Sequence, residues 1–194
     1  MGRYTDAMTL APTFEMETAR QLFVWPELPE RNGYEMVDGQ WEKMAMGNQS
    51  LYASSNLLVA LRHHGKLDGG HALPNESSVQ IWSDSPKTYR KPDGMYFAPG
   101  RLPDPIPDDH IHVVPDIVIE AVSKSDKEAH LNERVLAFLG VGVRMVWLLY
   151  PNTHTVLVYR PGGALSLLGP GDVLSGEDVL PGFAMPVEAI FEGV

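Results

Sequence analysis

Cysteine is absent from this 194-residue chain, and basic residues are few. Without cysteine the chain has no disulfide, thiolate zinc site, iron–sulfur cluster or cysteine nucleophile, so any metal must be held by oxygen or histidine. Its 15 lysines and arginines are outnumbered by 25 acidic residues, which gives a formal net charge of −10. This acidic excess argues against a general nucleic-acid binder, because such a protein needs a basic surface to neutralise phosphates.

Long apolar runs and nucleotide-binding loops are also lacking. No stretch approaches the ~18 to 20 consecutive apolar residues of a membrane span. The first ten residues are polar and include Asp6, which does not fit a secretory signal. Neither GxGxxG nor GxxxxGK[ST] occurs. We therefore expect a cytoplasmic protein with no membrane partner.

The composition that remains is typical of a globular domain. Apolar residues make up 44% of the chain and charged residues 21%. This length favours one domain, spanning residues 1–194, with residues 1–13 as a loose N-terminal segment.

Apolar spacing and turn residues predict many short elements, because 16 prolines and 18 glycines are scattered along the chain. In chain order we expect a helix over 14–24, a hairpin over 34–44 around Asp38-Gly39, a helix over 49–64 ending at Gly65, strands over 79–82 and 89–98, and a loop over 99–109.

The clearest unit is a strand followed by a helix and a second strand. Residues 113–122 are rich in valine and isoleucine, as in a buried strand. Ser125 and Glu128 have the spacing of a capping box, and an apolar stripe over 131–139 then predicts a helix. A hairpin over 144–160 and short strands near 164–168 follow. This order predicts an α/β (α+β) fold in which helices flank a mixed sheet.

Three acidic residues stand out because their surroundings are apolar. Asp93 follows Pro92, Asp116 enters the 113–122 strand, and Glu120 lies inside that strand. A buried carboxylate needs a partner. One interpretation is a salt bridge from Glu120 to an arginine such as Arg134. The other is a metal site in which Asp93, Glu120 and Asp116 provide ligands for Mg²⁺ or Mn²⁺.

Five motifs occur in an order that resembles the Uma-two family, a group of restriction-endonuclease-like domains within the PD-(D/E)xK nuclease superfamily. They are Tyr34-Glu-x-Val-Asp-Gly39, Arg90-x-Pro-Asp93, Pro115-Asp-Ile-Val-Ile-Glu-x-Val-Ser123, Gly142-Val-Arg-x-Val-Trp147 and Leu180-Pro-Gly-Phe183. The resemblance runs from about Phe14 to the C-terminus. It implies a restriction-endonuclease-like mixed sheet with added antiparallel hairpins.

The resemblance also implies a mechanism, which is metal-assisted hydrolysis of DNA phosphodiesters. Asp93 and Glu120 would hold the cation, and a nearby basic residue would stabilise charge on the phosphate. The superfamily lysine two residues after the second acid is Val122 here, and the helix position that the family uses instead is Arg134. An arginine stays protonated and cannot act as a base.

A second cation could compensate for the missing lysine. Lys127 lies seven residues before Arg134, so both would lie on nearly the same helix face. Its alternative interpretation is a solvated lysine in the first helical turn.

Two functions therefore remain open at the level of sequence. The first is a divergent divalent-metal-dependent endonuclease with DNA as its partner. The second is a catalytically inactive nuclease-fold domain that serves as a binding or assembly module. A homodimer is expected from the family and from the apolar hairpin segment Val156-Leu-Val-Tyr159, which could instead be an internal strand.

Overall fold

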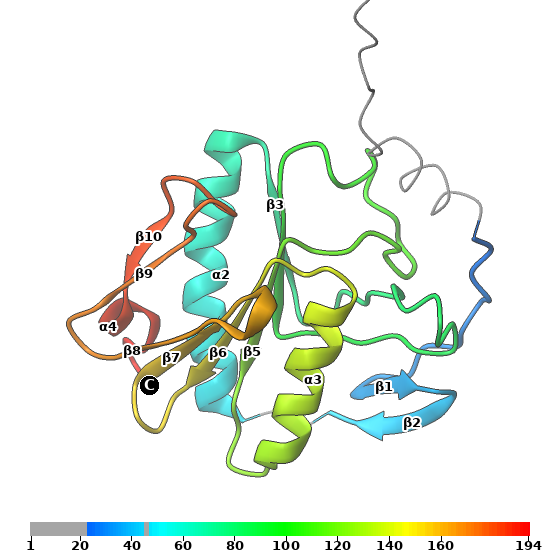
Figure 1. Ribbon diagram of the computed structural model, residues 1–194, viewed down its shortest axis with the longest axis horizontal. Helices are drawn as coiled ribbons and strands as arrows, with labels where there is room; N and C mark the ends of the chain where they lie inside the picture. The colour runs from blue at the N-terminus through cyan, green and yellow to red at the C-terminus, as the bar shows by residue number, and fades with distance from the viewer. Residues whose placement is uncertain (1–22, 45–46) are drawn as a thin grey trace, which may run out of the picture.

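A six-stranded mixed sheet, in the order β3-β4-β5-β6-β7-β8, is the centre of the computed structural model, which describes residues 23–44 and 47–194 (Figure 1). The main sheet and its helices comprise α2 (Asn48–Asp68), β3 (His71–Pro74), β4 (Gly94–Phe97), β5 (Ile117–Ala121), α3 (Glu128–Gly140), β6 (Met145–Tyr150), β7 (Thr155–Tyr159) and β8 (Leu165–Leu168). The smaller elements are β1 (Tyr34–Val37), β2 (Gln40–Lys43), η1 (Pro161–Gly163), β9 (Val173–Ser175), β10 (Ala184–Pro186) and α4 (Val187–Ile190).

Helices α2 and α3 lie on opposite faces of the sheet (Figure 1). On one face, Leu57 and Leu61 of α2 pack with Ile117 and Ile119 of β5, and α4 joins the same cluster. On the other, Val135 and Phe138 of α3 pack against β5, β6 and the loops near residues 79–82 and 111–114. Strand β5 is buried along its whole length because both faces are covered.

The crossover predicted from the sequence is confirmed. Strands β5 and β6 are parallel and are joined through α3, whereas each other neighbouring pair in the sheet is antiparallel. The mixed sheet with flanking helices is the predicted architecture. The hairpin predicted over 34–44 is β1-β2, and the one predicted over 144–160 is β6-β7 within the main sheet, whereas the small sheet of β9 and β10 was not predicted. In the first hairpin, Asp38 and Gly39 both have positive φ, as a two-residue turn requires.

Helix α2 is longer than predicted. Gly65 does not end it, and the helix continues to Asp68, where Gly69 takes the left-handed conformation with φ 88°. Gly65 is required for a different reason: a Cβ atom there would lie 2.6 Å from the carbonyl oxygen of Gly70. The chain can therefore turn tightly from α2 into β3 only because this side chain is absent.

Two further predictions are wrong in detail. Residues 79–82 form isolated bridges from Val79 to Arg90 and Ile111 rather than a continuous strand. The capping box does not form, since α3 begins after Lys127 without a side-chain cap, and Asp126 instead accepts a hydrogen bond from the Ser123 amide.

Other predictions fall at or beyond the limits of what the structure describes. The loose segment 1–13 and the helix predicted over 14–24 lie outside the described residues, apart from residues 23–24, which are not helical. Among the helices described, none is long and apolar enough to cross a membrane.

Candidate functional site

The sheet register brings Asp93 and Glu120 together. Strands β4 and β5 are antiparallel, with Gly94 opposite Ile119, so Asp93, one residue before β4, reaches the position opposite Glu120. Opposite residues in an antiparallel pair point to the same face, which here is the face covered by α3. Oδ2 of Asp93 accepts a hydrogen bond from the Ala121 amide at 2.7 Å. The two acids predicted as partners are thus neighbours.

Arg134 of α3 joins this pair from above the sheet. Its Nε donates a hydrogen bond to Oε1 of Glu120 at 2.8 Å. Glu120 is 7% exposed, and the Arg134 side chain is 18% exposed, so the ion pair is largely shielded from water. The salt-bridge interpretation of Glu120 is therefore observed, and the helix position assigned from the family motif does reach the site.

A third carboxylate, that of Glu35, was not assigned a role from the sequence. It comes from hairpin strand β1, is 2% exposed, and receives Nη2 of Arg134 on Oε1 at 2.8 Å and Nη1 on Oε2. The Lys91 amide also donates to it, and Nη1 of Arg90 lies 3.4 Å from Oε2. Glu35 stands in the first of the five motifs, so the signal was present, but only the fold shows that the hairpin docks against α3.

Burial and charge shift the acidities of these groups in opposite directions. Burial raises the pKa of Glu120 to about 8, with Asp93 and Glu35 adding to the rise and Arg134 opposing it. Burial likewise raises the pKa of Asp93 to about 6, against the Ala121 amide and Arg134, which lower it. Burial also acts to raise the pKa of Glu35, but contacts with Arg134 outweigh it and hold this pKa below the usual range. The nearby carboxylates keep the pKa of Arg134 well above its ordinary value, so it stays charged.

These residues border a small cavity of about 140 Å³. Its lining side chains and backbone belong to Glu35, Glu42, Lys43, Met44, Lys91, Asp93, Glu120, Ala121, Asp126, His130 and Arg134. Acidic groups outnumber lysine and arginine there by five to three. The ammonium of Lys91 is paired with Glu30 at 2.8 Å. The cavity therefore carries an excess of negative charge that a bound cation would reduce.

Two predicted site residues do not join this cluster. Asp116 lies four residues before Glu120, roughly 13 Å away along an extended strand. It accepts a hydrogen bond from the Ala98 amide at 2.8 Å and lies 3.6 Å from Nε of Arg101. Lys127 is exposed just before α3 and does not line the cavity.

Asp93 and Glu120 are the type of ligand that binds a hard cation, but among the described residues they do not form a complete coordination site. Asp93 Oδ1 and Glu120 Oε2 accept no hydrogen bond from the residues that the structure describes, so each has an oxygen available. Carboxylate oxygens are the preferred ligands of Mg²⁺ and Mn²⁺. Within residues 23–44 and 47–194, however, no group of three or more histidine or acidic side chains converges as a metal cage.

Comparison with known proteins identifies a family and a similar fold. The model of the Uma2 family, described as "Putative restriction endonuclease", matches residues 19–188. The fold is similar to the crystal structure of a "putative nuclease belonging to DUF820" from Anabaena variabilis, with a TM-score of 0.71 and 21% sequence identity. That match covers 85% of this chain and 93% of the other. No curated protein matches the chain.

Proposed function

Because the chain belongs to the Uma2 family of restriction-endonuclease-like proteins, we propose that it is a divalent-metal-dependent nuclease that hydrolyses DNA phosphodiesters. Asp93 and Glu120 would hold Mg²⁺ or Mn²⁺. The observation that carries this proposal is the opposition of these two carboxylates at the edge of a negatively charged cavity, each with an oxygen available to a ligand.

The protein's own groups have distinct roles in this proposal. A bound divalent cation lowers the pKa of a coordinated water and polarises a phosphate. Arg134 supplies positive charge beside it, and two of its five N–H groups remain beyond those used on Glu35 and Glu120. These two can donate to a phosphate oxygen, but a permanently protonated guanidinium cannot accept a proton. Glu35 holds Arg134 in place and is a positioning residue.

DNA binding by this site depends on the cation. Within the cavity the acidic excess repels a phosphate until a divalent ion reverses the local sign. The net charge of −10 adds long-range repulsion, which salt screens. We therefore expect DNA affinity to be weak without metal.

A second function has one specific observation in its favour. The guanidinium that occupies the place of the family's basic residue is bound by two buried carboxylates, Glu35 and Glu120. Such an ion-pair network offsets much of the buried negative charge without a metal. A catalytically inactive nuclease-fold domain that binds or assembles would retain this network for stability alone.

Calorimetric titration with Mn²⁺ at pH 8, combined with a supercoiled-plasmid cleavage assay, separates the two functions. Glu120→Gln is the informative variant because its amide oxygen can still accept the Arg134 hydrogen bond while losing the charge. Glu133→Gln, an exposed change on α3, is the matched control.

The nuclease proposal expects wild type and the control to bind Mn²⁺ and nick the plasmid. The Glu120 variant should lose about tenfold or more in metal affinity, the scale seen when a metal site is disturbed. Absence of metal binding by wild type would refute the nuclease. Metal binding without cleavage would favour the inactive domain.

We also propose a homodimer, with a contact surface other than the segment Val156-Leu-Val-Tyr159. The segment over 156–159 is the internal strand β7, and Val156 and Val158 are buried against the α2 side of the core. One edge of the sheet is β8, where Leu165 and Leu167 are 54% and 65% exposed. Two copies would pair antiparallel along this uncharged strand.

A further inference from the structure

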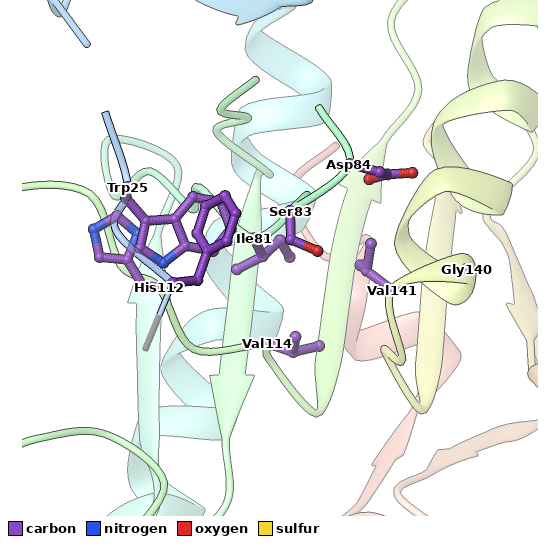
Figure 2. A pocket seen from close by; sticks show the side chains of 9 residues that line it. Trp25, Ile81, Ser83, Asp84, His112, Val114, Gly140 and Val141 are labelled. Atoms are coloured by element: carbon purple, nitrogen blue, oxygen red, sulfur yellow. The ribbon is translucent and has the colours of Figure 1, made fainter. Parts of the chain in front are cut away.

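A second cavity, of about 400 Å³, lies at the C-terminal end of α3 (Figure 2), whereas the cavity beside Asp93 and Glu120 is bordered by His130 and Arg134 of the same helix. It opens between an aromatic wall, Phe23 and Trp25, and the end of α3 at Gly140 and Val141. Along α3, Gly140 at the second cavity lies ten positions beyond His130 at the first, a rise of roughly 15 Å. A volume of this size is within the range of small-molecule sites, roughly 300–1,000 Å³.

The aromatic wall is held in place by stacking. The indole of Trp25 lies flat against His112, with ring centroids 5.0 Å apart and an interplanar angle of 4°. Phe23 meets Trp25 edge-on at 4.6 Å. The imidazole of His112 is fixed in turn by contact of its Nδ1 with the Gln80 carbonyl at 3.0 Å. His112 thus covers one face of the indole and holds this electron-rich ring at the cavity wall.

The opposite side of the cavity is electronegative. Asp84 points toward α3 at the cavity rim (Figure 2) and forms no ion pair with the described residues, although it is exposed. Helix α3 ends at this wall, and its last turn contains no basic residue, so nothing on the helix offsets the negative end of its dipole.

The position of Asp84 beside the helix is fixed by its neighbour Trp82. The Trp82 ring is 7% exposed and packs on Phe138 with centroids 5.5 Å apart. Its indole N–H donates to the Ala137 carbonyl at 3.3 Å. The loop that bears Ser83 and Asp84 is therefore anchored to the last turns of α3.

We propose that this cavity binds a small alkylguanidinium. A guanidinium is planar, stacks on an aromatic face and presents two parallel N–H groups to one carboxylate. Trp25 and Asp84 offer these two partners from opposite walls, and Ile81 and Val114 provide an apolar floor for the alkyl stem (Figure 2). The net charge of −10 attracts a cationic ligand over longer distances. This site is separate from the proposed nuclease site and does not depend on it.

The test compares n-butylguanidinium with n-butylurea, which has nearly the same shape but no charge. Binding to the full chain is measured by calorimetry and by ¹H–¹⁵N shifts of the tryptophan indoles at pH 7, without metal. Asp84→Asn removes the carboxylate charge from the cavity. Asp108→Asn is the matched control, because Asp108 is also an exposed loop aspartate and does not line the cavity.

We expect n-butylguanidinium to bind at least tenfold more tightly than n-butylurea and to shift the Trp25 indole signal. Asp84→Asn should weaken that binding about tenfold, and Asp108→Asn should leave it within twofold. Equal binding of both probes, or equal affinity of the two variants, would overturn the proposal. So would no binding to wild type. Because no metal or DNA is present, none of these results bears on the nuclease.

Discussion

Replacing Asp93 with asparagine should make the protein more stable at neutral pH. The Asp93 carboxyl is held in a largely buried position near Glu120 and Glu35, and its pKa rises from 3.8 to about 6. The folded state therefore binds a proton more readily than the unfolded state. Asparagine carries no charge at any pH, and its side-chain oxygen can still accept the hydrogen bond from the Ala121 amide.

The size and sign of the effect come from this difference in pKa. Below pH 3.8 the carboxyl is protonated in both states and costs nothing. As the pH rises toward 6, the unfolded chain releases the proton first, so the free energy of unfolding falls. Above pH 6 the loss is complete, and a rise from 3.8 to about 6 corresponds to at most about 3 kcal/mol.

Urea unfolding of wild type and Asp93→Asn between pH 3.5 and 8, with EDTA present, measures this directly. The variant should exceed wild type by about 1 to 3 kcal/mol at pH 8, and the difference should disappear near pH 3.5. Glu120 should also titrate at lower pH in the variant, because Asp93 is one cause of its raised pKa. A variant that is equally or less stable at pH 8 would refute the account of the site as electrostatically strained.

Three further outcomes follow from the structure. Arg134→Met leaves its carboxylate partners without a counter-charge, and should lower the free energy of unfolding by about 3 to 5 kcal/mol in urea titrations, with a smaller loss at acidic pH. Gly65→Ala should lower the melting temperature because of the 2.6 Å approach to backbone, whereas Gly140→Ala, with nothing within 4 Å, should not. If β8 joins two copies, Leu167→Lys should convert the dimer to a monomer, as measured by light scattering, because it places a charge on the paired edge. A wild-type protein that is already monomeric would contradict the dimer.

The sheet was the part of the fold most accessible from sequence. The valine- and isoleucine-rich run that contains Glu120, the helix that follows and the next apolar run predict a parallel strand–helix–strand unit, and β5, α3 and β6 form it. The helix end at Gly65 was misplaced because a glycine needed for close approach has the same sequence signature as a glycine that ends a helix. The capping box at Ser125 does not form, because α3 begins after Lys127 and the Ser125 hydroxyl contacts that of Ser123 at 3.0 Å in a turn that Asp126 closes by accepting from the Ser123 amide.

The site could be predicted only where it depends on strand register. Asp93 precedes β4 and Glu120 lies in β5, and the register of these two neighbouring strands places the two residues opposite each other. Glu35 lies 99 residues from Arg134 along the chain, and its role depends on how a separate hairpin docks, which no local pattern encodes. Asp116 points to the same face of the sheet as Glu120 but lies at the other end of β5. The alternation of side chains along a strand predicts which face a residue points to, but not how far apart two residues on that face lie.

The docking of hairpin β1-β2 has a consequence for motion. The hairpin pairs with neither edge of the main sheet, and its buried carboxylate, Glu35, binds Arg134 in the middle of α3. Local opening of the hairpin must therefore break that ion pair, so the hairpin amides should exchange with deuterium faster when Arg134 is replaced. The same opening would free the guanidinium from one of its two anchors and widen access to the carboxylates beneath.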